Sequence, residues 1–169
     1  GDPSKLSALI ALGSNLGDPK RHLQQAVDAL RSLPATTVKS VSHVYETAAW
    51  GVEDQPNFFN LAAEIETDLP PLEFLNACKA IETRLGREPG PKWGPRIVDI
   101  DIVLWGSEVL DNERLKIPHP DFRNRAFVLA PIAEIAGSTM DPVSGLTLAE
   151  LLERPEASGR VERQTELDH

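Results

Sequence analysis

The order of the periodic apolar segments constrains the fold of this chain more than any other feature. An apolar run ends in Gly13-Ser14-Asn15, one segment rich in β-branched residues and one with alternating residues follow, and a last apolar run contains two aspartates. Two segments with apolar residues at helical spacing lie between these runs. The sequence therefore predicts the order strand, helix, strand, strand, helix, strand. The expected fold is α+β, with a ferredoxin-like antiparallel sheet core covered by helices on both faces in three α-β-α layers. The predicted strands span 6–12, 38–47, 59–67 and 98–104.

Capping residues mark the ends of the predicted helices. Asp18 caps the first helix and Gly86 ends the second. A helix is also predicted over 127–135, and Thr147 with Glu150 resembles a capping box that opens a last short helix. We expect a short edge strand at 109–110, a single domain over 1–169, and a frayed polar tail over 155–169.

Composition excludes several classes of protein. The 41% hydrophobic and 25% charged residues are ordinary for a globular protein, and no stretch is long and apolar enough to span a membrane. Residues 1–7 lack the pattern of a signal peptide, so we expect a cytoplasmic protein. The single cysteine, Cys78, excludes an intrachain disulfide, and its place on an apolar helix face favours a packing role.

The charge distribution suggests a local anion site. The net charge of −9 argues against a nucleic-acid binder. Eight of the seventeen basic residues nevertheless flank the aspartate-containing strand, although such clusters are often only solvated surface. These eight are Arg84, Arg87, Lys92, Arg96, Arg114, Lys116, Arg123 and Arg125.

The aspartates are the strongest candidates for metal binding. In a strand, Asp99 and Asp101 point to the same face as Val103, with Cα atoms roughly 7 Å apart. This arrangement suits divalent cations that also bind substrate phosphates. A solvated strand face is the simpler interpretation of an isolated pair of aspartates. The rest of this strand is apolar, however, and acidic residues are unexpected there without a function. The residues predicted on the opposite face are Val98, Ile100, Ile102 and Leu104.

Two long Pro/Gly-containing loops flank possible sites, at 48–57 and 87–95. The turn at 13–18 is glycine-containing but fails the P-loop template, because no Lys-Ser or Lys-Thr follows its second glycine. Phosphates must therefore be held by other groups, and arginines can bind them bidentately.

Six motifs resemble, in order, the 6-hydroxymethyl-7,8-dihydropterin pyrophosphokinase family of folate biosynthesis. The resemblance runs from about Ala8 to Ile135. The motifs are Gly13-Ser14-Asn15, Tyr45-Glu46-Thr47, residues 54–60 (DQPNFFN), Gly86-Arg87, residues 93–101 (WGPRIVDID) and Pro118-His119-Pro120.

The resemblance implies an activity and a set of catalytic residues. The family transfers the pyrophosphoryl group of ATP, a co-substrate, to the hydroxymethyl oxygen of the pterin and releases AMP. Its paired aspartates, which match Asp99 and Asp101, hold two Mg²⁺ ions. Arg87 and Arg96 match phosphate-binding arginines and, with the aspartates, form the expected catalytic set. The expected partners are ATP and the pterin, with no nucleic acid or membrane, and the expected state is a monomer.

The resemblance also implies two binding sets. The pterin set consists of aromatic stacking residues and polar groups that contact the ring edge, although core packing is the alternative for either phenylalanine. It comprises Thr47, Ala48, Trp50, Phe58, Asn60 and Phe127. The ATP set comprises Lys79, Glu82, Arg87, Trp93, Arg96, Ile102, His119 and Arg125. The chain departs from the common family pattern at Trp50, Lys79, Pro120 and the weakly basic 88–91 segment.

Two alternatives belong to other classes. A Mg-dependent nucleotidyltransferase would place its Gly-Ser turn close to its aspartate pair, whereas Ser14 and Asp99 are 85 residues apart here (99 − 14). A small acidic ferredoxin-like binding or regulatory module would leave the two long loops beside one acidic strand unexplained.

Overall fold

The computed structural model describes most of the chain. The described residues are 6–15, 18–47, 58–86, 97–120, 122–154 and 161–163. Within them the strands are β1 (Leu6–Ser14), β2 (Thr36–Val41), β3 (Tyr45–Thr47), β4 (Phe58–Thr67), β5 (Asp99–Trp105), β6 (Leu110–Asp111), β7 (Lys116–Ile117) and β8 (Val161–Arg163). The helices are α1 (Pro19–Arg31), α2 (Pro71–Leu85), α3 (Ala126–Ala136), α4 (Leu148–Glu153) and the 3-10 helix η1 (Phe122–Asn124).

One antiparallel sheet organises the molecule, as the order of elements predicts. Its strand order is β5-β1-β4-β3-β8, and β2 pairs with β4 on the same edge as β3. Helix α1 connects β1 to β2, and α2 connects β4 to β5. The predicted ferredoxin-like core is confirmed.

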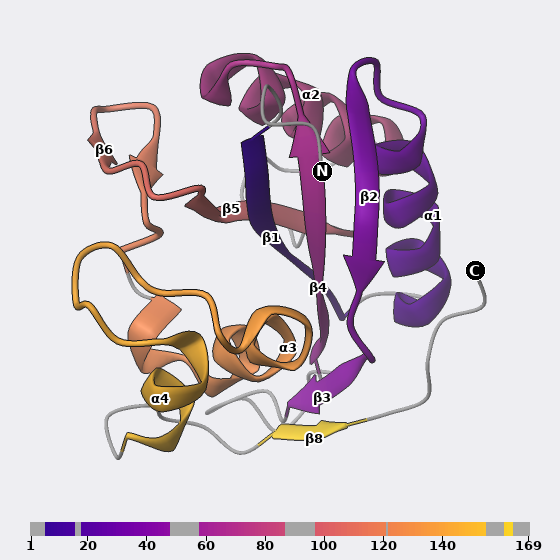
Figure 1. Ribbon diagram of the computed structural model, residues 1–169. Helices are drawn as coiled ribbons and strands as arrows, with labels where there is room; N and C mark the ends of the chain where they lie inside the picture. The colour runs from indigo at the N-terminus through magenta and orange to yellow at the C-terminus, as the bar shows by residue number, and fades with distance from the viewer. Residues whose placement is uncertain are drawn as a thin grey trace.

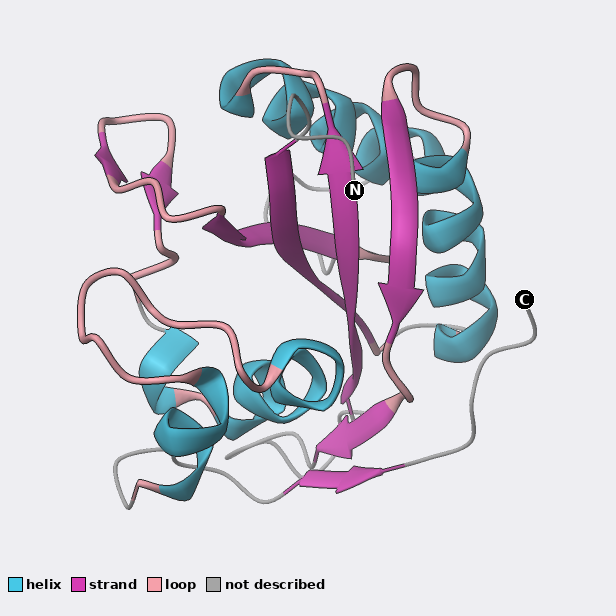
Figure 2. Cartoon of the chain, viewed as in Figure 1, coloured by secondary structure: helices cyan, strands magenta, loops and turns pink. Residues whose placement is uncertain are grey.

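Helices cover both faces of the sheet, so the three-layer prediction is also confirmed (Figures 1 and 2). Each face carries its own apolar cluster. Helices α1 and α2 cover one face, where Leu23, Phe74 and Ile100 belong to the same buried cluster. Helices α3 and α4 cover the other face, where Phe122 and Leu129 belong to the second cluster. The cavity described below lies on this second face.

The segment predicted as one strand over 38–47 forms two strands instead. Residues 42–44 leave the ladder between β2 and β3, and Ser42 maintains the contact with β4 at this break. Its N–H donates to the carbonyl of Ala62 at 2.9 Å, and its hydroxyl accepts from the N–H of Ala62 at 2.9 Å. These two hydrogen bonds continue the pairing with β4 across the break.

A β-bulge changes the predicted face of Leu104. Leu9 pairs with Leu104 whereas Ile10 pairs with Ile102, so Val103 is an extra residue in β5. Val103 and Leu104 consequently both belong to the cluster under α3 and α4. The prediction that Leu104 shares a face with Ile100 and Ile102 is wrong, because the alternation of side chains restarts after the bulge.

The remaining local predictions are largely confirmed. The side chain of Asp18 accepts from the N–H of Arg21, and both hydrogen bonds of the Thr147/Glu150 capping box are present. Strand β8 pairs with β3 within the segment predicted as a frayed tail, and the sequence does not predict this strand. In the part of the chain that the structure describes, no helix has the length and apolar character needed to cross a bilayer.

Candidate active site

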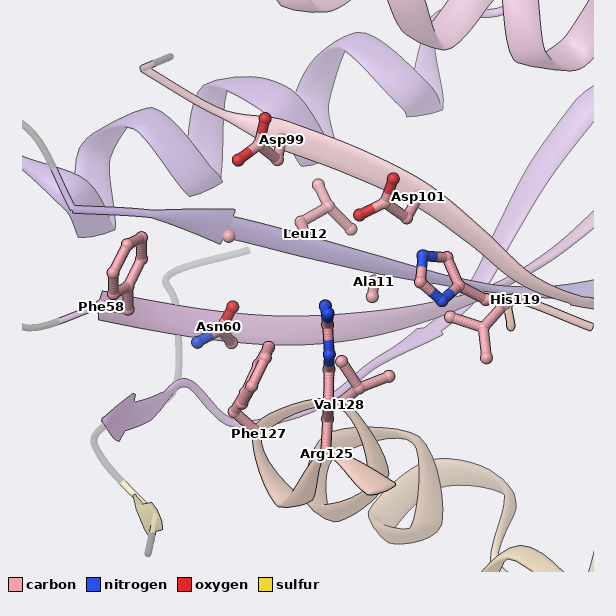
Figure 3. A pocket seen from close by; sticks show the side chains of 12 residues that line it. Ala11, Leu12, Phe58, Asn60, Asp99, Asp101, His119, Arg125, Phe127 and Val128 are labelled. Carbon is pink, nitrogen blue, oxygen red and sulfur yellow. The ribbon is translucent and has the colours of Figure 1, made fainter. Parts of the chain in front are cut away.

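A cavity of about 150 Å³ opens on the α3 face of the sheet, beside the first turn of α3 (Figure 3). Strands β1, β4 and β5 form its floor, and the start of α3 and the segment after β7 form its walls. Its lining residues are Ala11, Leu12, Gly13, Phe58, Asn60, Asp99, Asp101, Val103, His119, Arg125, Phe127 and Val128. Seven residues of the predicted site therefore lie around one cavity, although they are far apart in the sequence.

Asp99 and Asp101 lie on the cavity face of β5, as predicted. Both are exposed, whereas Ile100 between them is buried on the opposite face. On the adjacent strand β1, Gly13 pairs with Asp99 and Ala11 pairs with Asp101. Because these two partners have minimal side chains, the carboxylates border an open floor, which the sequence pattern of β1 alone does not reveal.

Asn60 occupies the centre of the floor, and it leaves no room for a side chain at position 13. Gly13 and Asn60 are cross-strand partners, and a Cβ atom on Gly13 would lie 2.6 Å from Oδ1 of Asn60. The amide nitrogen Nδ2 of Asn60 is buried and has no hydrogen-bond partner among the described residues. An unsatisfied buried donor is costly, so Nδ2 is well suited to donate to a ligand in the cavity.

Aromatic side chains border the cavity at separate positions. Phe58 begins β4 and is 38% exposed, which is unusual for a phenylalanine that packs in a core. Phe127 projects from the first turn of α3 toward Asn60 (Figure 3). The guanidinium of Arg125 lies 5.7 Å from the centre of the Phe127 ring. This arrangement fits a flat ligand with polar edges better than it fits simple core packing.

His119 borders the cavity near Asp101 (Figure 3). Its backbone N–H donates to the carbonyl of Val103 at 3.0 Å, which ties the segment after β7 to β5. The guanidinium of Arg125 and the two carboxylates thus place both kinds of charge around the same opening, beside the imidazole of His119. Such a combination can bind a polyanion together with cations.

Three residues of the predicted ATP set lie outside the cavity. All three are on the face of the sheet opposite the cavity. Ile102 of β5 is buried in the cluster under α1 and α2, and Lys79 and Glu82 are on α2. The carboxylate of Glu82 accepts from the N–H of Ile100 at 2.6 Å and lies 3.3 Å from Nζ of Lys79. Glu82 therefore holds the backbone between the two aspartates, a contact that the sequence does not reveal. Since β5 is an edge strand, these residues lie around the sheet edge from the aspartates.

Several predicted site residues fall outside the described residues. They are Ala48, Trp50, Arg87, Trp93 and Arg96. Thr47 ends β3, but its side chain is likewise not among those described.

The turn predicted to begin at Gly13 is wrong for its first two residues, because Gly13 and Ser14 pair with β4 as the last residues of β1. Ser14 is 2% exposed, and its hydroxyl donates to the carbonyl of Ile97, just before β5. This hydrogen bond joins the end of β1 to the start of the strand that carries the aspartates. The sequence does not predict this contact, because residues 14 and 97 are far apart in the chain.

Cys78 has the packing role predicted for it. Its side chain is fully buried in the cluster under α1 and α2. Burial, with the nearby charge of Glu82, raises the pKa of the thiol to about 12. The thiol therefore stays protonated and is a poor nucleophile.

Comparisons with known proteins agree with this geometry. A family model described as 7,8-dihydro-6-hydroxymethylpterin-pyrophosphokinase (HPPK) matches residues 9–137. A 2-amino-4-hydroxy-6-hydroxymethyldihydropteridine pyrophosphokinase from Bacillus subtilis is 50% identical over 128 residues, covering 76% of this chain and 77% of the relative. The protein of the same name from Pseudomonas aeruginosa is 46% identical over 143 residues, covering 85% of this chain and 88% of the relative.

Solved structures give the same fold. A crystal structure of Plasmodium falciparum HPPK-DHPS aligns with a TM-score of 0.72 at 14% identity, covering 94% of this chain and 49% of that one. This chain thus spans about half of that longer protein, and the likeness at this identity concerns the fold alone. The match of the family model over most of the chain, and the identity to both relatives, show that the chain belongs to the 7,8-dihydro-6-hydroxymethylpterin-pyrophosphokinase family.

Proposed function

We propose that this chain transfers the pyrophosphoryl group of ATP to the hydroxymethyl group of 6-hydroxymethyl-7,8-dihydropterin, giving AMP and the pterin diphosphate in folate biosynthesis. The observation that carries the proposal is the combination of family membership with one cavity that joins two carboxylates to an aromatic and amide-lined floor. The two alternatives have no comparable support, because neither accounts for both halves of the cavity.

The aspartate pair fits magnesium. Asp99 and Asp101 offer exposed oxygen donors on one face, and magnesium characteristically takes one or two carboxylates together with substrate phosphates. In the described part of the chain, no group of three or more His, Cys, Asp or Glu side chains is placed to hold a metal ion. Two bound Mg²⁺ ions would offset triphosphate charge and lower the pKa of the acceptor hydroxyl.

The pterin is proposed to lie over the centre of the floor. Phe58 and Phe127 would contact its faces, and Nδ2 of Asn60 would donate to its polar edge. The family resemblance adds Thr47, Ala48 and Trp50 to this set. The hydroxymethyl group would then point toward the carboxylates on β5.

ATP is proposed to place its triphosphate beside the aspartates and its nucleoside at the edge of β5. His119 and Arg125 line the cavity and would contact the phosphates, whereas Lys79, Glu82 and Ile102 lie around the strand edge. Arg87, Trp93 and Arg96 are assigned to ATP through the family resemblance. Guanidinium groups at 87 and 96 would stabilise the charge that develops on the transferred group.

The decisive experiment is product analysis. The protein is incubated with Mg-ATP and the reduced pterin, and nucleotides and pterins are separated by chromatography. Equal amounts of AMP and pterin diphosphate are expected. ADP, or no pterin-dependent product, would contradict the proposal.

We further propose that the protein works as a monomer in the cytoplasm without nucleic acid or membrane. Light scattering after size exclusion should give a mass near 18.5 kDa. A larger species at assay concentrations would contradict the monomer.

A further inference from the structure

A carboxylate outside the cavity joins the two sides of the proposed pterin site. Glu134 is on α3 and contacts the segment between β2 and β3. Its oxygens accept from the N–H of His43 at 3.1 Å and lie 2.7 Å from Nδ1 of the same residue. The hydroxyl of Tyr45 also donates to Glu134, at 2.7 Å. A single side chain of α3 thus collects three donor groups from residues 43 and 45.

Tyr45 belongs to a row of residues that crosses the cavity floor. The cross-strand pairs are Asp99 with Gly13, Gly13 with Asn60, and Asn60 with Tyr45. Directly opposed side chains share one face of a sheet, so Tyr45 stands beside Asn60. Tyr45 is buried, with 8% exposure, and its hydroxyl faces α3. Tyr45 is therefore the cross-strand neighbour through which α3 can act on Asn60.

Helix α3 lacks two of the hydrogen bonds that commonly stabilise a helix near its start. Its N-cap residue, Arg125, makes no side-chain capping hydrogen bond, and Pro131 cannot donate to the carbonyl of Phe127. Glu134 lies seven residues after Phe127, which places both on the same helix face about 10 Å apart along the axis. Helix α3 packs against β3 and β4 at this position (Figure 1).

We propose that Glu134 is a positioning residue that fixes α3, and with it Phe127, against β3 and Asn60, and so sets the spacing of the pterin-binding groups. The proposal rests on the proposed function, since it concerns the same cavity. Glu134 itself does not line that cavity.

The charge state of Glu134 supports this role. Burial tends to raise the pKa of its carboxyl, but the hydrogen bonds from Tyr45 and His43 outweigh burial and hold the pKa below its ordinary value. The carboxylate remains ionised at neutral pH, and hydrogen bonds to an ionised acceptor are stronger than neutral ones. The side chains of His43 and Glu134 are 26% and 22% exposed, so the group is only partly shielded from water.

The test compares affinities for the two substrates. Glu134→Ala keeps a strong helix former but removes every acceptor, whereas Glu134→Gln retains one oxygen and the length of the side chain. Tyr45→Phe removes only the hydroxyl. Equilibrium binding of the reduced pterin is measured with a saturating non-hydrolysable ATP analogue and Mg²⁺, and the affinity for the analogue is measured separately.

For Glu134→Ala we expect the Kd for the pterin to rise about tenfold, as loss of hydrogen bonds to a charged group predicts, while the Kd for the nucleotide changes less than about twofold. Glu134→Gln should restore part of the affinity. Tyr45→Phe should weaken pterin binding in the wild type but have little further effect in Glu134→Ala, because both changes remove the same hydrogen bond. Glu153→Ala, a matched change on the exposed face of α4, is the control.

The outcomes separate this inference from the proposed function. A folded Glu134→Ala variant with wild-type pterin affinity, or an equal loss of affinity for both substrates, would overturn the positioning role. If Glu134→Ala does not fold, Glu134→Gln and Tyr45→Phe decide by the same criterion. Failure of the unmodified protein to bind the pterin or to form AMP would instead count against the proposed function.

Discussion

At the scale of single residues, the aspartates on β5 should matter for the reaction and not for stability. Asp99→Asn and Asp101→Asn each keep the size of the side chain but replace a charged carboxylate, a proposed metal ligand, with a neutral amide at an exposed position. We expect each change to lower the rate of AMP formation at least about a hundredfold, because metal coordination contributes several kcal/mol to such reactions. The free energy of unfolding should change by less than about 0.5 kcal/mol, as for other exposed positions.

The control for this prediction is Asp111→Asn on β6. Its side chain is 83% exposed and lies 3.9 Å from Lys116. It should leave both the rate and the stability unchanged. Near-normal rates in Asp99→Asn and Asp101→Asn, measured at saturating Mg-ATP, would remove the metal-binding role from these residues.

Gly13 should be required for the conformation of Asn60. In Gly13→Ala the new Cβ would lie 2.6 Å from Oδ1 of Asn60, so the amide must move. We expect the KM for the pterin to rise about tenfold, because the unpaired donor leaves its place, while the KM for ATP stays within about twofold. In the background of Asn60→Ala the same glycine change should have little further effect. A large additional loss in the double variant would show that Gly13 acts by another route.

At the scale of secondary-structure elements, Ser14 should stabilise the start of β5. Ser14→Ala removes the hydrogen bond to the carbonyl of Ile97 at a buried position, and we expect the free energy of unfolding to fall by about 1 kcal/mol. Ser7→Ala is the control on the same strand, because Ser7 is exposed and its hydroxyl only contacts Glu64 at 3.3 Å. Urea denaturation measures both. Equal stabilities of the two variants would contradict the role of Ser14.

Regular periodicity made part of this architecture predictable. The alternation in β5 places Asp99 and Asp101 opposite Ile100, and the helical spacing of Phe74, Cys78 and Ile81 marks the buried face of α2. These features depend only on neighbouring residues, so they can be derived from the sequence. The family resemblance then supplied candidate roles that periodicity cannot give.

Other features depend on contacts between distant segments. The bulge at Val103 moves Leu104 to the other face, and no local pattern announces it. Glu134 meets His43 across 91 residues of sequence, and an exposed helix position would ordinarily carry such a residue without any partner. Pairing of this kind is decided by how layers pack, which is why the sequence did not predict it.

At the scale of the whole molecule, the position of the cavity follows from the separation of the two helical layers. Helices α1 and α2 cover their face with a cluster that extends along β1, β4 and β5. Helices α3 and α4 pack on the opposite face, and the cavity lies beside the first turn of α3. The site therefore depends on where the layer of α3 and α4 packs on the sheet. Contacts within this layer should also influence the stability of the protein.

A buried ion pair in the second layer should make the stability of the protein depend on acid pH. Asp141 is fully buried in the turn between α3 and α4, and it accepts from Arg123 of η1 and from the N–H groups of Val143 and Ser144. Burial tends to raise the pKa of its carboxyl, but the hydrogen bonds and charge of Arg123 and the hydrogen bonds from the turn outweigh burial and lower the pKa to about 2.

Because the pKa in the folded protein lies below the value of 3.8 for a free aspartate, the ionised form favours folding. Its contribution is complete above about pH 4 and is lost as the pH falls through about 2, with a size of about 2 kcal/mol. Urea denaturation from about pH 5 to about pH 2 should therefore show the stability difference between wild type and Asp141→Asn shrinking by that amount. Asp28→Asn, the same change at an exposed position on α1, is the control. A difference that stays constant across this range would mean that Asp141 contributes through its shape and hydrogen bonds alone, and that the charge of the pair has no net effect on folding.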